Sequence, residues 1–181
     1  LIDAGVGTYT RQTFSNERYS IWTMQSNYHN LPMINGVAQK NGKKYKASEV
    51  KASPNRFEAN IATAYPQEAQ VKKWIRSYRL KGKQVMVNDA FELEKAIAPN
   101  IINFLTWAII DDVKPGKIIL QVKGKKAELI YNPQMFELET ETVELTDRRL
   151  SNVWGKQIYR LSFKAKQLAK KGNYSFTIKS L

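Results

Sequence analysis

From residue 44 onward, apolar side chains recur at every second position in short runs, separated by turns that contain glycine or proline. Successive side chains of a strand point to opposite faces, so this spacing predicts strands with one buried face, joined as antiparallel hairpins. A sheet with one apolar face must pack against another layer. The sequence therefore predicts an all-β fold, an antiparallel β-sandwich, in a single domain over residues 1–181. The clearest runs are residues 74–80, 85–93, 118–122, 127–131, 159–165 and 174–178.

Helical patterns are few in this chain. Residues 15–18 and 66–70 each predict a single turn of helix, the second with proline in its first turn. Residues 7–28 form the longest stretch without strand alternation and are rich in Tyr, Arg, Trp and Asn, which indicates a functional loop. The chain begins without a methionine, on residues that read as the second half of a strand ending at Asp3 and Gly5. We therefore expect an excised piece of a longer protein.

Composition excludes several classes of protein. An apolar content of 43% with four Trp, nine Tyr and seven Phe is typical of a folded chain and not of a disordered one. The longest apolar stretch, residues 97–110, is interrupted by polar side chains and is shorter than the roughly 18 residues of a membrane span. No membrane span is therefore expected. The absence of cysteine excludes disulfides and thiolate metal sites, and it is compatible with a reducing cytosol or a bacterial periplasm.

Charge is distributed unevenly along the chain, whose formal net charge is +13. Residues 37–88 carry nine Lys and three Arg against three Glu, whereas residues 128–147 carry six acidic residues and no basic one. A basic surface of this kind favours an anionic partner such as a polysaccharide, a nucleic acid or an acidic lipid. The alternative is a solvated lysine-rich surface with no partner. We expect no nucleic-acid binding, because the sequence shows no reader helix and no basic helix.

His29 is the only histidine of the chain, and Asp3 is the carboxylate at the end of the first expected strand. Imidazole and carboxylate are common zinc ligands, but a structural zinc site takes three or four donors and only these two are visible. In the alternative interpretation, His29 hydrogen-bonds a backbone carbonyl and Asp3 caps a turn. The two residues are 26 positions apart, so sequence spacing alone does not bring them together.

Aromatic and basic side chains gather in the expected loop. Arginine binds a carboxylate or sulfate through two parallel hydrogen bonds, and aromatic rings pack against sugar rings, so this set suits an acidic sugar. The alternative is that half of these side chains only pack the loop onto the sandwich. The loop residues in question are Tyr9, Arg11, Arg18, Tyr19, Trp22 and Tyr28.

Asp89 falls on the apolar face of its strand and needs a partner such as Arg76 or Arg79 across the hairpin.

The order of these residues resembles the second domain of the heparinase II/III-like polysaccharide lyase family. That domain has an Asp-x-Gly strand end, then an Arg, then a His-Asn segment that ends in Gly. Asp3 with Gly5, Arg18, and His29 with Asn30 match those positions. The hairpin of residues 74–89 is similar to a later Arg-containing hairpin of the family. The specific motifs lie before residue 40.

The resemblance implies that this chain is a C-terminal, supersandwich-like β-sandwich whose N-terminal α/α toroid is missing. Family members cleave uronic-acid glycans of the heparan sulfate or alginate kind by β-elimination. The family's catalytic residues come from the toroid and from a histidine segment that precedes the Asp-x-Gly strand, so none is expected here. The implied partners are an acidic polysaccharide and the missing toroid, and the implied location is the bacterial periplasm or the exterior. We expect this chain to be inactive alone.

The resemblance also implies a zinc or other divalent ion in the parent protein, with Asp3 and His29 as two of its ligands. The third ligand belongs to the missing histidine segment, so we do not expect this chain alone to retain the ion. Asn30 is expected to order the loop beside the ligands. The residues expected to bind substrate are Tyr9, Arg11, Arg18, Tyr28 and Asn30.

A second function stays open at this stage. A non-catalytic β-sandwich that binds anionic glycans, or that acts as a scaffold, would use the Tyr- and Arg-rich loop by itself. Asp3 and His29 would then have no metal role.

Overall fold

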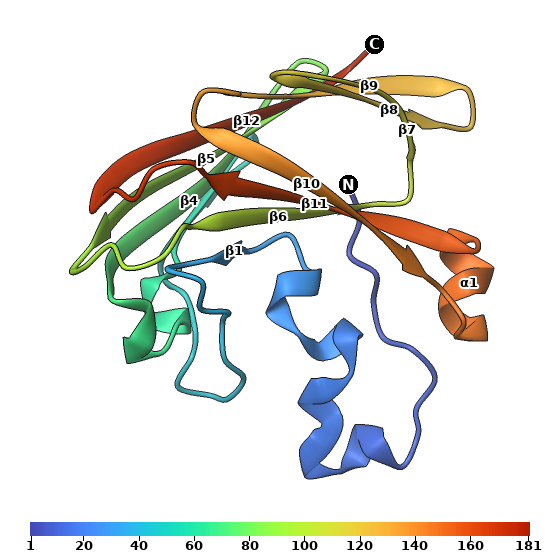
Figure 1. The fold of residues 1–181 in the computed structure, drawn as a ribbon, viewed down its shortest axis with the longest axis horizontal. Helices are drawn as coiled ribbons and strands as arrows, with labels where there is room; N and C mark the ends of the chain where they lie inside the picture. The colour runs from blue at the N-terminus through green and yellow to red at the C-terminus, as the bar shows by residue number, and fades with distance from the viewer.

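Two antiparallel β-sheets pack face to face in the computed structural model, which describes residues 1–181 (Figure 1). This confirms the predicted all-β sandwich. The smaller sheet has the order β1-β6-β11-β10, with β1 Pro32–Met33, β6 Ile101–Thr106, β11 Gln157–Ala165 and β10 Phe136–Glu144. The larger sheet has the order β2-β3-β4-β5-β12-β9-β8-β7. Its strands are β2 Ser48–Ser53, β3 Arg56–Asn60, β4 Val71–Lys81, β5 Gln84–Leu93, β12 Lys171–Ser180, β9 Lys125–Tyr131, β8 Lys117–Val122 and β7 Ile109–Lys114.

Aromatic rings fill the space between the sheets. Phe163 of β11 lies 4.9 Å from the ring centroids of both Tyr131 and Phe176, in edge-on geometry. Trp74 of β4 stacks on Phe91 of β5 at 4.9 Å. Edge-on and offset contacts of this kind add stability beyond the area that the rings bury. The main core therefore consists of the inward faces that the alternation predicts.

The smaller sheet is covered on its second face as well. A separate cluster of six buried residues forms there, between the sheet and the segments that cover it, which are the N-terminal segment and the single α-helix, α1 Arg148–Trp154. Asp147 caps this helix by accepting hydrogen bonds from the backbone N–H groups of Arg149 and Leu150. No helix of the structure has the length and apolar character needed to cross a membrane. The cluster consists of Ile2, Ala4, Leu105, Leu145, Leu150 and Ile158.

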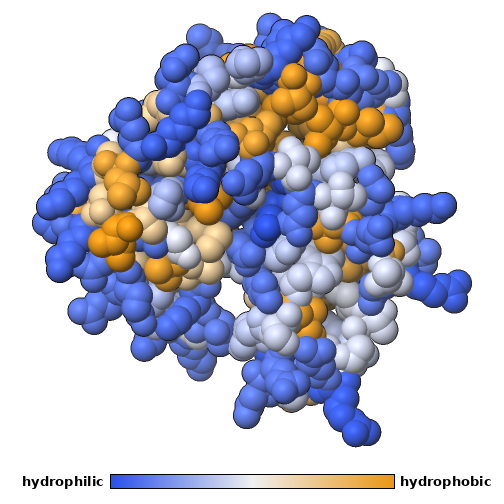
Figure 2. All heavy atoms as spheres, in the orientation of Figure 1, coloured by the Kyte–Doolittle hydropathy of each residue, from blue (hydrophilic) through white to orange (hydrophobic).

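Residues 5–30 form a separate region, the N-terminal lobe, on the side of the smaller sheet that faces away from the larger one (Figure 1). The lobe consists of four short 3-10 turns, and only Thr13 and Thr23 of its residues are buried. Its surface, at the bottom of Figure 2, is mostly hydrophilic or neutral. The turns are Gln12–Phe14, Asn16–Ser20, Trp22–Met24 and Ser26–Tyr28; two further 3-10 turns, Ala62–Ala64 and Gln67–Ala69, lie before β4.

The expected strand at the start of the chain is wrong. The Ile2 N–H donates to the Leu105 carbonyl at 2.9 Å, but the residues that follow form no ladder with β6. The Asp3 carboxylate accepts from the Gly5 N–H at 2.9 Å, and Gly5 has a positive φ of 75°. This turn directs the chain away from the sheet, into the lobe. The expected helical turns at residues 15–18 and 66–70 are present as 3-10 turns.

Candidate functional site

Asp3 and His29 meet at the point where the lobe joins the sandwich. His29 Nδ1 lies 2.7 Å from Asp3 Oδ2, and His29 Nε2 lies 3.2 Å from the Thr23 carbonyl oxygen. Both ring nitrogens thus face oxygen atoms of the protein. Burial raises the Asp3 pKa, but the hydrogen bonds from His29 and Gly5 outweigh it and leave that pKa below its ordinary value. The sequence left open whether these residues are neighbours, and the structure places them in contact.

Asn30 fixes this junction through both ends of its side-chain amide. Its Nδ2 donates to the Ile2 carbonyl at 2.7 Å, and its Oδ1 accepts from the Leu105 N–H at 2.9 Å. One side chain therefore joins the first residues of the chain to β6, directly beside His29. These contacts are those of a residue that holds the backbone, as expected for a group that orders the loop. Its expected role in binding substrate stays a prediction.

A buried ion pair supports the same junction from the sandwich. Arg76 of β4 donates to Asp89 of β5 through Nε at 2.8 Å and Nη2 at 2.6 Å, and the Trp74 indole N–H donates to Asp89 at 2.7 Å. Burial alone would lower the Arg76 pKa, but the Asp89 carboxylate raises it above its ordinary value. Arg76 Nη1 donates to the Asn30 carbonyl. Arg76, and not Arg79, is thus the partner that Asp89 requires.

The donor types of a zinc site are present at Asp3 and His29, but the number of donors is not. A structural zinc site takes three or four ligands. No group of three or more His, Cys, Asp or Glu side chains in the structure is placed to hold an ion. The pair in this chain is therefore a partial donor set, and its geometry is that of a hydrogen-bonded pair.

The four Tyr and Arg residues expected to bind substrate do not gather in one place. Tyr9 is 57% exposed on the outer side of the lobe. Arg11 is exposed at the start of the first 3-10 turn. The Arg18 guanidinium lies 5.4 Å from the Tyr19 ring centroid, and its Nε is buried without a hydrogen-bond partner. Tyr28 lies on the inner side of the lobe against the smaller sheet.

Tyr28 anchors the lobe to the smaller sheet. Its hydroxyl donates to Glu141 Oε1 of β10 at 3.1 Å, and the Arg160 guanidinium of β11 lies 4.3 Å from its ring centroid. Arg160 also pairs with Glu141 at 2.6 Å. Burial raises the Tyr28 pKa, which favours the protonated hydroxyl that donates this hydrogen bond. Tyr28 therefore packs the loop onto the sandwich, which was one of the two alternatives that the sequence left open. No local sequence pattern identifies Glu141 and Arg160 as its partners.

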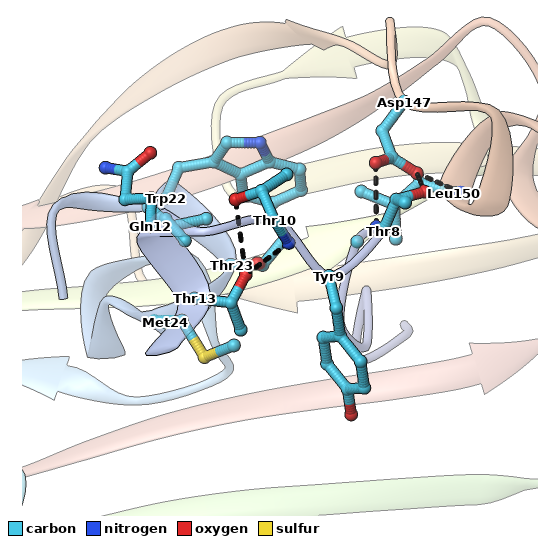
Figure 3. Close-up of a pocket in the computed structure, with 12 residues that line it drawn as sticks. Thr8, Tyr9, Thr10, Gln12, Thr13, Trp22, Thr23, Met24, Asp147 and Leu150 are labelled. Carbon is cyan, nitrogen blue, oxygen red and sulfur yellow. Dashed lines mark hydrogen bonds between the residues drawn. The ribbon is translucent and has the colours of Figure 1, made fainter. Parts of the chain in front are cut away.

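A pocket of about 210 Å³ lies between the lobe and the start of α1 (Figure 3). Asp147 joins its two sides, because its carboxylate accepts from the Thr8 N–H at 2.8 Å while it caps the helix. The hydrogen bond from the Thr8 N–H, which outweighs slight desolvation, lowers the Asp147 pKa. We name this the threonine pocket; it is lined by Gly7, Thr8, Tyr9, Thr10, Gln12, Thr13, Ile21, Trp22, Thr23, Met24, Asp147 and Leu150.

Sequence reasoning missed both the pocket and Asp147. An aspartate just before Arg148 and Arg149 is a possible helix cap, and that signal was present in the sequence. The contact from Asp147 to Thr8 spans 139 positions, so no local pattern identifies it.

No protein-family profile and no curated protein matches this sequence. Its fold, however, is similar to solved structures. The heparan sulfate lyase HepC from Pedobacter heparinus superposes with a TM-score of 0.66 at 15% identity, over 98% of this chain and 28% of that protein. A mutant of HepC gives a TM-score of 0.67 at the same identity and coverage. A heparinase III gene product gives a TM-score of 0.69 at 14% identity, over 99% of this chain and 28% of that one.

These likenesses show the fold. The chain spans 28% of the length of the lyases that it matches. Its twelve strands thus have the architecture of one part of the heparan sulfate lyases, a β-sandwich that accounts for less than a third of their length.

Proposed function

We propose that this chain is the C-terminal β-sandwich domain of a bacterial polysaccharide lyase that cleaves uronic-acid glycans by β-elimination. The observation that carries the proposal is the fold likeness to heparan sulfate lyases over 98–99% of the chain. The contact of Asp3 with His29 at 2.7 Å supports it, because the resemblance to the lyase family pairs these two residues. Heparan-sulfate-like and alginate-like glycans both fit the net charge of +13.

The reaction needs three groups of distinct chemistry. The uronate carboxylate must be neutralised, a base must take the proton at C5, and an acid must protonate the leaving oxygen at C4. His29 is the only histidine, and its ring nitrogens are both engaged by oxygen atoms. We therefore assign the base and the acid to a toroid domain of the parent protein, and no catalytic residue to this chain. In this proposal the parent works in the periplasm or outside the cell.

Asp3 and His29 would be two ligands of a divalent ion, zinc among the candidates, in the parent protein, where the ion would replace one of the two contacts of the His29 ring. The donor types fit, and a further donor from outside these residues would complete the set. Such an ion would supply structural rigidity to the junction. Asn30 and Arg76 hold the backbone on which the two ligands stand, whichever ion is bound.

The test is to assay the parent protein on a panel of uronate polysaccharides and to follow the ultraviolet absorbance of the unsaturated uronate product. Heparan sulfate, alginate and a neutral glucan would form the panel. We expect absorbance to rise with one or more uronate polymers for the parent, and not for the 181-residue chain alone. A parent protein that is inactive on every uronate polymer would contradict the proposal.

A non-catalytic glycan-binding sandwich is the second candidate. The observation in its favour is that exposed aromatic rings lie beside arginines without a carboxylate partner, Tyr9 beside Arg149 and Tyr19 beside Arg18. Glycan binding by the chain, together with an inactive parent, would favour this function over the lyase.

A further inference from the structure

The lobe and the adjacent start of α1 carry arginines that have no carboxylate partner. Three of the eight arginines, Arg56, Arg76 and Arg160, pair with carboxylates. Four of the other five lie in the lobe or at the adjacent start of α1. Guanidinium groups without a carboxylate partner leave positive charge available to an anionic ligand. The four are Arg11, Arg18, Arg148 and Arg149.

Arg149 stands beside two exposed aromatic rings that contact each other. The Arg149 guanidinium lies 5.5 Å from the Tyr9 ring centroid, and Tyr9 meets Phe14 edge-on at 5.8 Å. Phe14 is 78% exposed, more than any other large apolar side chain of the protein. Exposed aromatic rings beside a guanidinium suit a ligand that has both an apolar ring face and a negative charge.

The threonine pocket adjoins this rim, since Tyr9 lines it (Figure 3). Its volume of about 210 Å³ is below the ~300–1,000 Å³ of pockets for drug-sized ligands, so it suits one ring. Hydroxyl groups dominate its polar lining. Together with the apolar side chains that also line the pocket, they suit a sugar ring, which carries both hydroxyl groups and apolar C–H faces.

Thr23 gives the pocket a polar group with no partner in the protein. Thr23 lines the pocket, is only 4% exposed, and its Oγ1 has no hydrogen-bond partner. A buried hydroxyl is costly when unpaired, so this atom indicates a place for a ligand or for water. The carbonyl oxygen of the same residue contacts His29 Nε2, so the pocket adjoins the Asp3–His29 junction.

We propose that the threonine pocket and the Tyr9–Arg149 rim form a subsite for one ring of an anionic glycan. The Thr23 hydroxyl binds a hydroxyl of the ring, Tyr9 and Phe14 pack on the chain of sugars, and Arg149 binds the sulfate or carboxylate. The assignment rests on the proposed function for its glycan class, and it adds Thr23, Phe14 and Arg149 to the residues that the sequence identified.

The test is calorimetric titration of the 181-residue chain with heparan sulfate, alginate and neutral dextran oligosaccharides. We expect Arg149→Ala to weaken binding of the anionic glycans about tenfold, as for the loss of one charge-assisted contact. Arg79→Ala is the matched control, because Arg79 is an exposed arginine on β4 without a carboxylate partner. It should change affinity less than about twofold. Stronger binding of heparan sulfate than of alginate would assign sulfate to Arg149, and the reverse would assign carboxylate.

Thr23→Val separates binding from folding. Valine keeps the shape of threonine and removes an unpaired buried hydroxyl, so the melting temperature should stay the same or rise. Glycan affinity should fall by about two- to tenfold, as for the loss of one neutral hydrogen bond. Equal losses for Arg149→Ala and Arg79→Ala, unchanged affinity for Thr23→Val, or no binding of either anionic glycan would each overturn the subsite.

The outcome also separates this proposal from the lyase proposal. If the parent cleaves a uronate polymer but Arg149→Ala and Thr23→Val leave its KM unchanged, the subsite is wrong and the lyase stands. If those variants only destabilise the parent, the lobe face contacts another part of that protein and the subsite is again wrong. If the chain binds glycan through Arg149 and the parent is inactive, the subsite stands and the lyase proposal fails.

Discussion

The sandwich and the N-terminal lobe are held together by different means. The sandwich has a core of 23 buried apolar residues between two sheets, whereas residues 5–30 bury only two threonines. The lobe is held by polar contacts at separate points, among them those of Asn30, Tyr28 and Asp147, and by Trp22, which packs against the second apolar cluster. Regions with few buried apolar contacts open at lower free energy than the core, and binding sites are commonly found in them. The comparison teaches that the sandwich provides rigidity, whereas the lobe carries the pocket and the polar groups on which the proposed glycan subsite rests.

The largest effect is expected at the buried ion pair of the sandwich, whose Arg76 also donates to the Asn30 carbonyl of the lobe. Asp89→Ala would leave the Arg76 guanidinium buried without its carboxylate, and breaking such a pair costs about 3–5 kcal/mol. The free energy of unfolding from urea denaturation measures this. Arg79→Ala, at an exposed position of β4, the strand of Arg76, should change the free energy of unfolding by less than about 0.5 kcal/mol. A loss for Asp89→Ala as small as the control's would show that the ion pair is not essential to the sandwich.

A double variant sharpens the comparison. Arg76→Met with Asp89→Leu replaces the ion pair by apolar side chains, which often restores the stability of a core. The Asn30 carbonyl would still lose its donor from Arg76. We therefore expect urea stability above that of Asp89→Ala, together with faster amide exchange in residues 26–31. Unchanged amide exchange in residues 26–31 would show that the order of the lobe does not depend on the buried ion pair.

The next effect is expected at Asn30, the side chain that joins the lobe to β6. Asn30→Ala removes both amide hydrogen bonds and leaves the Leu105 N–H without a partner, at a cost of about 1–3 kcal/mol. Hydrogen exchange should show the loss as faster opening of residues 1–30, with the central strands β5 and β12 less affected. Gln25→Ala is a matched control, since that amide makes one hydrogen bond, within the exposed part of the lobe. A uniform loss of protection over the whole chain would contradict a locally held lobe.

The same contrast explains which elements the sequence predicts. Strands β4 and β5 show clear alternation because only one of their faces is buried. Strand β6 does not alternate, because its sheet is covered on both faces and five of its six residues are buried. Strand β2 has no buried face and gives no apolar period. Alternation is thus a record of one-sided burial, and it fails where burial is double or absent.

The site residues follow a similar rule. His29 and Asp3 were identified as residue types suited to metal binding, but only the resemblance to a family paired them across 26 positions. Tyr28 was identified as an aromatic residue in a loop, and the structure places it against Arg160 and Glu141 of the smaller sheet. Tertiary contacts at long separation leave no periodic trace in a sequence. Residue chemistry was therefore predictable, and the grouping of residues was not.

The smallest effect is expected at Asp147, which ties Thr8 of the lobe to α1. The hydrogen bond from the Thr8 N–H lowers the Asp147 pKa below its ordinary value of 3.8. A carboxyl group whose pKa is lower in the folded than in the unfolded state stabilises the fold at neutral pH, and this contribution is lost as pH falls through the folded pKa. The tie between the lobe and α1 should therefore persist at pH 5 and loosen only below about pH 4, while the sandwich core stays folded.

Nuclear magnetic resonance can follow the titration of Asp147 at two residues whose amide groups donate to it, Thr8 in the lobe and Leu150 in α1. The amide resonances of Thr8 and Leu150 should shift together with an inflection below pH 3.8 in the unmodified protein. Asp147→Asn keeps a side-chain oxygen that caps α1 but removes the titrating charge, so both inflections should disappear. An inflection at or above the ordinary value, or one that persists in Asp147→Asn, would mean that another group controls this joint. The titration of Asp147 would then not control the contact between the lobe and α1, and the lobe would be held to the sandwich by its other contacts, those of Asn30, Tyr28 and Trp22.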